Sequence, residues 1–276
     1  MEELIGMKTL YLSDLDGTLL RSDETISDHT REVIERLTES GMIFSYATAR
    51  SFLTARKVTK GLRAKIPLIV YNGAFVVDNV TGGILFGNYF DDSVQEVLCE
   101  LFRNEIYPIV YSFAGHTEKF CYIREKCTEG MKRFLDSRKR DVRNTPVADT
   151  GELIQGNCFY ITCIDEPDKL YPMYERFREQ FHCVYERDIY SREQWLEIMP
   201  GTVSKAGAAA RLKELTGCGR MVVFGDGKND IELFRMADEC YAMANAADEL
   251  KKIATAVIEG NDEDGVAKWL ARHFAG

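Results

Sequence analysis

The stretch Lys8–Leu20 constrains the fold most, because a short apolar run ends abruptly in two carboxylates. Residues 10–12 are apolar and β-prone, which predicts a buried strand, and Asp14, Asp16 and Gly17 follow. In an open α/β sheet, ligands bind at the carboxyl ends of the strands. Two carboxylates at close range need a cation between them, and Mg²⁺ prefers oxygen ligands. The stretch therefore predicts a metal site, although an Asp-rich turn alone would read the same way.

Length, charge and cysteine content narrow the class of protein. The chain has 276 residues, a net charge of −9 and no basic block, so nucleic acid is not an expected partner. Its apolar runs are strand-sized and no basic leader begins it, so we expect no membrane partner and a cytoplasmic location. The eight cysteines contain no Cys-x-x-Cys pair, which favours reduced thiols. We also expect a monomer or a weak homodimer.

Strands and helices alternate in the first part of the chain. After the opening strand we expect a helix over 29–40 capped by Ser27 or Asp28, a strand over 42–47, a helix over 51–61 and a strand over 67–71. This order predicts a parallel sheet with crossover helices.

The alternation of strands and helices changes near residue 76, and a different pattern follows. We expect a helix over 91–104, strands over 107–112 and 119–123, a helix over 128–138, a strand over 158–164, a helix over 167–180 and a strand over 183–186. This segment predicts an inserted α+β cap, or lid, over 87–190. A strand at 195–199 is expected to resume the core. The predicted fold is therefore α/β, with a Rossmann-like, doubly wound parallel core formed by 1–86 and 191–276.

Polar side chains gather at the predicted strand ends. They are Asp14, Asp16, Thr48, Asn72, Asp226, Asn229 and Asp230, with Lys205 entering from a helix. Carboxylates on two strands together with a lysine can hold a dication and a phosphate. Such a set suits phosphate-ester hydrolysis, in which one carboxylate attacks phosphorus and another transfers protons.

These side chains can be assigned to steps of that reaction. Asp14 would form an aspartyl phosphate, and Asp16 would act first as an acid and then as a base. Mg²⁺ would be held by Asp14, Asp226 and the backbone carbonyl of Asp16. Lys205 and Thr48 would bind the phosphoryl oxygens.

Four motifs together resemble those of the haloacid dehalogenase (HAD) superfamily. They are Asp14-Leu-Asp16-Gly17-Thr18, the strand-end Thr48, Lys205 within Gly-Thr-Val-Ser-Lys-Ala, and Gly225-Asp226-Gly227-Lys228-Asn229-Asp230. A cap inserted after Asn72-Gly73-Ala74 is similar to the Cof-type subfamily of metabolite phosphatases. The resemblance covers the whole chain. It implies the roles above, with Asn229 contacting substrate or phosphate and Asp230 orienting metal-bound waters as an outer ligand.

Two positions depart from the family pattern. The chain has Thr48-Ala49-Arg50 where the family usually has Thr-Gly-Arg, and Ala244-Asn245-Ala246 where it often has Gly-Asn-Ala. Ala49, Arg50 and Asn72 complete the expected phosphate- and substrate-binding set. Arg50 is either a substrate contact or a surface helix residue. In the cap, His116, Arg187 and Asp188 either face the site or are solvated loop residues.

The sequence thus predicts a Mg²⁺-dependent phosphatase that hydrolyses a small phosphorylated metabolite, with a sugar phosphate as the expected substrate. A phosphomutase or phosphotransferase of the same fold would return the phosphoryl group to an acceptor other than water. A phosphosugar-sensing module would bind without turnover. A dehalogenase is disfavoured because Asp16, Lys205 and Asp226 suit phosphoryl chemistry.

Overall fold

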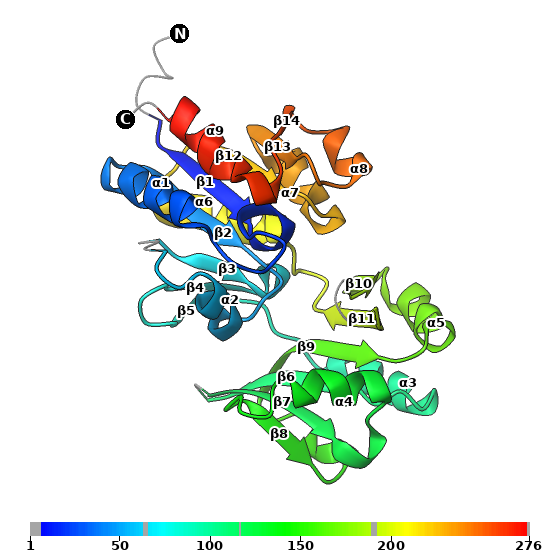
Figure 1. Cartoon of the computed structure of the whole chain (residues 1–276). Coiled ribbons are helices and arrows are strands. Elements are labelled where there is room, and N and C mark those ends of the chain that lie inside the picture. Colours follow the sequence, from blue (N-terminus) through cyan, green and yellow to red (C-terminus); the bar gives the residue numbers. More distant parts are fainter. Residues whose placement is uncertain (1–6, 63–65, 116, 189–191, 275–276) are drawn as a thin grey trace. The chain divides into compact units, whose positions relative to one another are not determined.

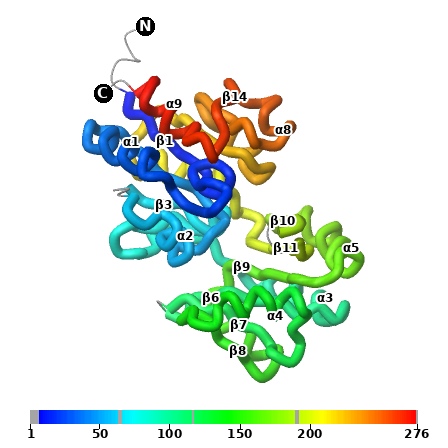
Figure 2. Tube along the Cα trace, in the orientation of Figure 1, coloured from blue at the N-terminus to red at the C-terminus, as the bar shows by residue number. Residues whose placement is uncertain are grey.

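The computed structural model describes residues 7–62, 66–115, 117–188 and 192–274. The chain divides into two compact units, Met1–Gly87 with Ser204–Gly276, and Asn88–Val203. We call them the core unit and the inserted unit. Figure 2 follows the chain out of the core unit after the cyan segment and back into it at the yellow one.

The core unit is built on one sheet. Its strands are β1 (Thr9–Asp14), β2 (Ile43–Ala47), β3 (Leu68–Val70), β4 (Phe75–Val77), β5 (Ile84–Gly87), β12 (Arg220–Gly225), β13 (Glu239–Met243) and β14 (Ala256–Ile258). Their order is β14-β13-β12-β1-β2-β3-β4-β5, parallel from β14 to β3 and antiparallel in the β3-β4-β5 extension. The sequences of the central strands are mostly apolar because both faces of the sheet are covered. The predicted doubly wound α/β core is confirmed.

Helices flank this sheet, as Figure 1 shows for α1, α9 and α6. The helices are α1 (Asp28–Glu39), α2 (Phe52–Val58), α6 (Lys205–Thr216), α7 (Ile231–Met236), α8 (Asp248–Lys251) and α9 (Gly265–His273). The predicted cap of α1 is present, since Ser27 Oγ accepts a hydrogen bond from the Thr30 backbone N–H. The apolar stripe of α1 is buried, and α1 packs beside α9. These helices close the core around the sheet.

The inserted unit has its own sheet and helices. Its strands are β6 (Ile109–Ala114), β7 (Thr117–Ile123), β8 (Asn144–Val147), β9 (Asn157–Ile164), β10 (His182–Arg187) and β11 (Gln194–Met199), and its helices are α3 (Ser93–Arg103), α4 (Glu129–Asp136) and α5 (Pro167–Phe177). The strand order is β10-β11-β9-β6-β7-β8. Apolar residues of α3 and α5 pack with one face of this sheet into a separate hydrophobic core. The two units therefore have independent cores.

Two expectations about the inserted unit were wrong. The strand at 195–199 does not resume the core, because β11 pairs antiparallel with both β9 and β10. The second boundary accordingly falls at 203/204 and not at 190/191. Strand β8 was not predicted, because Pro146 interrupts its β-prone pattern. As an edge strand, β8 tolerates the missing N–H.

The described residues contain no helix that combines the length and apolarity needed to cross a bilayer. All eight cysteines are free thiols. Among the candidate cap residues, His116 lies outside the described residues. Arg187 is exposed at the end of β10, and Asp188 follows it.

Candidate active site

Lys205 joins two carboxylates that are distant in sequence. Asp14 is the last residue of β1, and Lys205 begins α6 behind the Ser204 cap. Lys205 Nζ lies 2.7 Å from Asp14 Oδ1 and 2.8 Å from Asp230 Oδ1. All three side chains are buried. Burial alone would lower the pKa of Lys205, but Asp14 and Asp230 raise it above its ordinary value, so the lysine is held as a cation.

Asp226 brings a third carboxylate to the same place from the end of β12. Its Oδ1 accepts a hydrogen bond of 2.7 Å from Thr18 Oγ1. Gly17 has φ +74°, and a Cβ there would lie 2.2 Å from Asp226 Oδ2. A side chain at Gly17 would therefore push Asp226 away. The glycine of the first motif is required both by its backbone conformation and by the space beside Asp226.

The carboxylates of Asp14, Asp226 and Asp230 form an acidic cluster. One oxygen from each lies within 4.8 Å of the others. Burial raises the pKa of Asp14 well above its ordinary range, with Asp230 and Asp226 adding to the shift against Lys205. Burial likewise raises the pKa of Asp226 to about 6. Three carboxylates face one lysine, so a divalent cation fits the donor set and would relieve the excess negative charge.

Asp230 also shapes the loop that carries Asp226. Its Oδ2 accepts hydrogen bonds of 3.2 Å from the backbone N–H groups of Asp226 and Gly227. The side chain is fully buried. Asp230 therefore holds Lys205 through one oxygen and the backbone of the Asp226 loop through the other. One of its oxygens lies among the possible metal ligands, together with those of Asp14 and Asp226.

Arg50 pairs with Asp16, the expected acid/base residue. Arg50 Nε and Nη2 donate to the two Asp16 oxygens at distances of 2.6 to 3.2 Å. Arg50 Nη2 also donates to Glu24 Oε2 at 2.6 Å. Burial would lower the pKa of Arg50, but these two carboxylates raise it. Helix α2 begins at Phe52, so the reading of Arg50 as a surface helix residue was wrong.

The remaining expected binding residues occupy three adjoining loops. Thr48 is fully buried, and its Oγ1 accepts from the Arg50 backbone N–H at 3.1 Å, while Ala49 is exposed. The Asn72 backbone N–H donates to the Thr48 carbonyl at 2.9 Å. Asn229 Nδ2 donates to Asn72 Oδ1 at 3.3 Å. The second-motif loop, the loop after β3 and the loop after β12 are thus tied together at the strand ends.

The loop after β3 approaches the start of α6 very closely. Gly73 has φ +98°, and a Cβ there would lie 2.2 Å from the Ser204 carbonyl oxygen. Its neighbours Tyr71 and Asn72 also have positive φ. Positive φ is rare for a bulky residue such as Tyr71, so this loop is strained. The strain accompanies the placement of Asn72 beside the segment that begins with Lys205.

Three contributing residues were not predicted as site residues. Thr18 is the last residue of the first motif, and its position beside Asp16 and Gly17 is a usable signal. Asn245 follows strand β13 and donates from Nδ2 to the Gly17 carbonyl at 2.7 Å. Its place at a strand end is the corresponding signal. Glu24 lies in a loop with no motif, so the sequence contains no signal for it.

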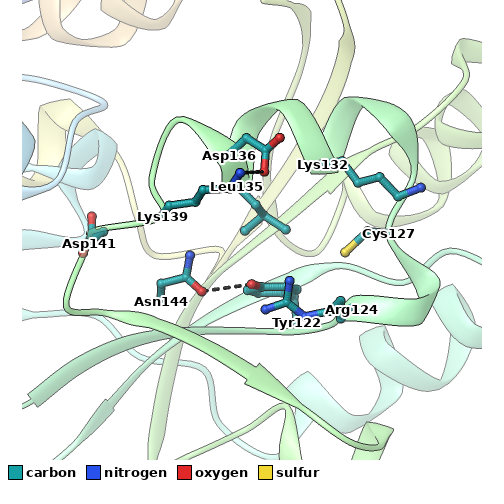
Figure 3. Close-up of a pocket in the computed structure, with 9 residues that line it drawn as sticks. All are labelled: Tyr122, Arg124, Cys127, Lys132, Leu135, Asp136, Lys139, Asp141 and Asn144. Atoms are coloured by element: carbon teal, nitrogen blue, oxygen red, sulfur yellow. Dashed lines mark hydrogen bonds and ion pairs between the residues drawn. The ribbon is translucent and has the colours of Figure 1, made fainter.

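A cavity of about 340 Å³ lies within the inserted unit (Figure 3). Its charged and polar side chains are largely paired, with Lys139 on Asp136 and Tyr122 on Asn144. It is lined by Tyr122, Arg124, Cys127, Lys132, Leu135, Asp136, Lys139, Asp141 and Asn144. None of these is an expected site residue. The acidic cluster of the core unit is therefore the candidate active site.

Comparison with known proteins agrees with this geometry. A model of the haloacid dehalogenase-like hydrolase family matches residues 11–270. The chain is 26% identical to 5-amino-6-(5-phospho-D-ribitylamino)uracil phosphatase YitU of Bacillus subtilis, over 96% of this chain and 97% of that protein. It is also 26% identical to the phosphatase YwtE of Bacillus subtilis, which bears the same enzyme name, over 95% and 97%. The crystal structure of TM0651 from Thermotoga maritima is similar with a TM-score of 0.79 and 25% identity, covering 98% of this chain and 99% of that one.

Proposed function

We propose, since the chain belongs to the haloacid dehalogenase-like hydrolase family, that this phosphatase of small phosphorylated metabolites is Mg²⁺-dependent and uses Asp14 as nucleophile. The observation that carries the proposal is the acidic cluster of Asp14, Asp226 and Asp230 around Lys205. A lysine held as a cation beside a strand-end carboxylate suits a phosphoryl group, which carries negative charge on its oxygens.

The reaction divides into two transfers. In the first, an Asp14 oxygen attacks phosphorus, the bond from phosphorus to the leaving oxygen breaks, and Asp16 donates a proton to that oxygen. In the second, Asp16 takes a proton from water, the water oxygen bonds to phosphorus, and the bond from phosphorus to Asp14 breaks. Inorganic phosphate is released, and both carboxyl groups return to their starting states.

The charges around Asp14 match the needs of these transfers. Asp14, Asp226 and the backbone carbonyl of Asp16 would hold Mg²⁺, with Asp230 as an outer ligand, and the bound ion supplies positive charge against the phosphoryl oxygens. Lys205 supplies a second positive charge. We propose five further contacts to the phosphate or the substrate: Thr48, Ala49, Arg50, Asn72 and Asn229.

The proposed substrate is an alkyl phosphate of a sugar or a sugar alcohol. The names of YitU and YwtE specify a phosphate ester on a ribityl chain, which supports this class. We also propose that the inserted unit acts as the cap that selects the substrate. Replacing 88–203 with the corresponding segment of a relative of different specificity should change the preferred substrate while the acidic cluster is kept.

The test is a panel of phosphorylated metabolites assayed with metal-free enzyme and after addition of Mg²⁺. We expect phosphate release only with Mg²⁺, and a rate equal to that of substrate loss. Metal-independent turnover would overturn the metal assignment. Substrate loss without free phosphate would favour a mutase, and tight binding without turnover would favour the sensing module.

A further inference from the structure

Glu24 occupies a backbone position that ordinarily suits glycine or asparagine. The Arg21 backbone N–H donates to the Thr25 carbonyl, and the Glu24 N–H donates to the Arg21 carbonyl, both at 2.9 Å. These bonds close a tight hairpin loop in which Glu24 has φ +62°. The closing position of such a three-residue loop is left-handed, and glycine adopts it without strain. A glutamate there is strained, which raises the question of what its side chain does.

The Glu24 carboxylate binds the cation that holds Asp16. Arg50 Nη2 lies 2.6 Å from Glu24 Oε2 and 2.6 Å from Asp16 Oδ1. The Arg50 side chain is 19% exposed, and those of Asp16 and Glu24 are 33% and 40% exposed. Glu24 meets Arg50 through one N–O contact and its side chain is 40% exposed, so this contact contributes at most about 1 kcal/mol to folding stability. The strain at Glu24 is therefore not explained by a gain in stability from the pair.

Arg50 bridges the carboxylates of Asp16 and Glu24. The Nε–Nη2 edge of the planar guanidinium faces both oxygens of Asp16. The arginine stem has several rotatable bonds, so one carboxylate alone leaves its orientation poorly restrained. Glu24 supplies the second anchor and sets where the Asp16 carboxylate is held.

We propose that Glu24 is a positioning residue that acts through Arg50 to hold Asp16 in line with the leaving oxygen of the substrate. This inference rests on the proposed function and adds a specific residue to it. In the described contacts the Glu24 carboxylate pairs with Arg50 and does not touch the acidic cluster. Its effect on kcat/KM arises in the first transfer, where Asp16 gives its proton to the leaving oxygen as the phosphorus–oxygen bond breaks.

The leaving group distinguishes positioning from a merely structural role. An alkoxide leaves poorly without a proton, whereas p-nitrophenolate leaves readily without one. A displaced Asp16 should therefore slow the hydrolysis of an alkyl phosphate but not that of p-nitrophenyl phosphate. The value of kcat/KM reports this first transfer for both substrates.

The experiment compares wild type, Glu24→Gly, Glu24→Gln and Asp16→Asn on p-nitrophenyl phosphate and on the best alkyl phosphate of the panel. For Glu24→Gly we expect kcat/KM to fall about 10- to 100-fold on the alkyl phosphate and less than about 2-fold on the aryl phosphate, with an unchanged or higher melting temperature. Glu24→Gln keeps an acceptor oxygen for Arg50 and should lose less. Glu39→Gln, an exposed glutamate on α1, is the matched control and should change neither rate.

The outcomes separate this inference from the proposed function. Equal loss on both substrates, or no loss on either, in Glu24→Gly would overturn the positioning role. Leaving-group dependence in Asp16→Asn but not in the Glu24 variants would overturn this inference alone. If Asp16→Asn shows no leaving-group dependence, the acid role of Asp16 is overturned, and the inference with it. Unchanged turnover in Asp14→Asn would instead overturn the proposed nucleophile.

Discussion

Each unit of the molecule buries a cation between two carboxylates, but the two arrangements differ in how completely their charges are satisfied. In the inserted unit, Arg143 is 4% exposed and donates to Glu118 and to both oxygens of Asp141. In the core unit, Lys205 is 2% exposed and lies between Asp14 and Asp230. Both arrangements hold buried charge by pairing it.

The difference is the third carboxylate of the core unit. Burial opposes ionisation of Asp141, but its hydrogen bonds from Arg143 prevail and lower its pKa. Burial and neighbouring carboxylates raise the pKa of Asp14 and Asp226, and one lysine does not compensate. The Arg143 cluster is thus complete as it stands. The acidic cluster is left with excess negative charge, which is the condition for binding a cation and a reacting group.

The largest expected effect is on catalysis. Asp14→Asn should lower phosphate release by roughly 10⁴-fold or more, about 5.4 kcal/mol in barrier height, because the proposed nucleophile is lost. Folding should survive, since the change removes one of three crowded carboxylates. Phosphate release and circular dichroism measure the two quantities. Substantial remaining turnover would require another nucleophile.

The second largest expected effect is on folding stability, and it concerns the Arg143 cluster of the inserted unit. Arg143→Met leaves Glu118 and Asp141 without their cation, and should lower the free energy of unfolding by about 3 to 5 kcal/mol. Urea denaturation followed by circular dichroism measures the loss. Activity below the melting transition should be unchanged. A loss under about 1 kcal/mol would show that Arg143 is no more important than a surface pair.

Metal binding should depend on pH in a direction set by the acidic cluster. In the metal-free protein the pKa of Asp226 is raised to about 6, above the ordinary value of 3.8. Between these values the folded state holds a proton that the unfolded chain has lost, so this contribution to stability falls as pH rises through the window.

Mg²⁺ should replace that proton above the window. At 100 times its Kd it should raise the melting temperature by roughly 5 to 10 °C at pH 7.5, and by less at pH 5, where protons compete. Thermal melts with and without Mg²⁺ at both pH values test this expectation. An equal shift at both would contradict the assignment of Asp226 as a ligand.

The smallest effect is expected at an exposed pair beside the cavity. The side chains of Lys139 and Asp136 are 72% and 65% exposed. Lys139→Met should change the free energy of unfolding by less than about 0.5 kcal/mol. It is the matched control for Arg143→Met because both remove one cation from the inserted unit. A large loss here would mean that burial does not explain the difference.

Much of the site followed from local sequence signals. Asp14, Asp226 and Asp230 stand in motifs directly after apolar strands, and parallel strands bring their carboxyl ends together. The expectation that strand 195–199 belongs to the core failed for a related reason. An alternating apolar strand shows that it has a buried face, but does not show which sheet supplies its partners.

The sequence by itself determined the parallel core and the inserted segment and predicted the site residues, because strand periodicity, helix caps and strand-end motifs are all local. Only the tertiary structure decided the partners of β11, the position of Lys205 between two carboxylates and the link from Glu24 through Arg50 to Asp16. These depend on contacts between residues far apart in the chain, as with Lys205 and Asp14, which are 191 positions apart. No local pattern encodes such a distance, since packing of the whole core sets it.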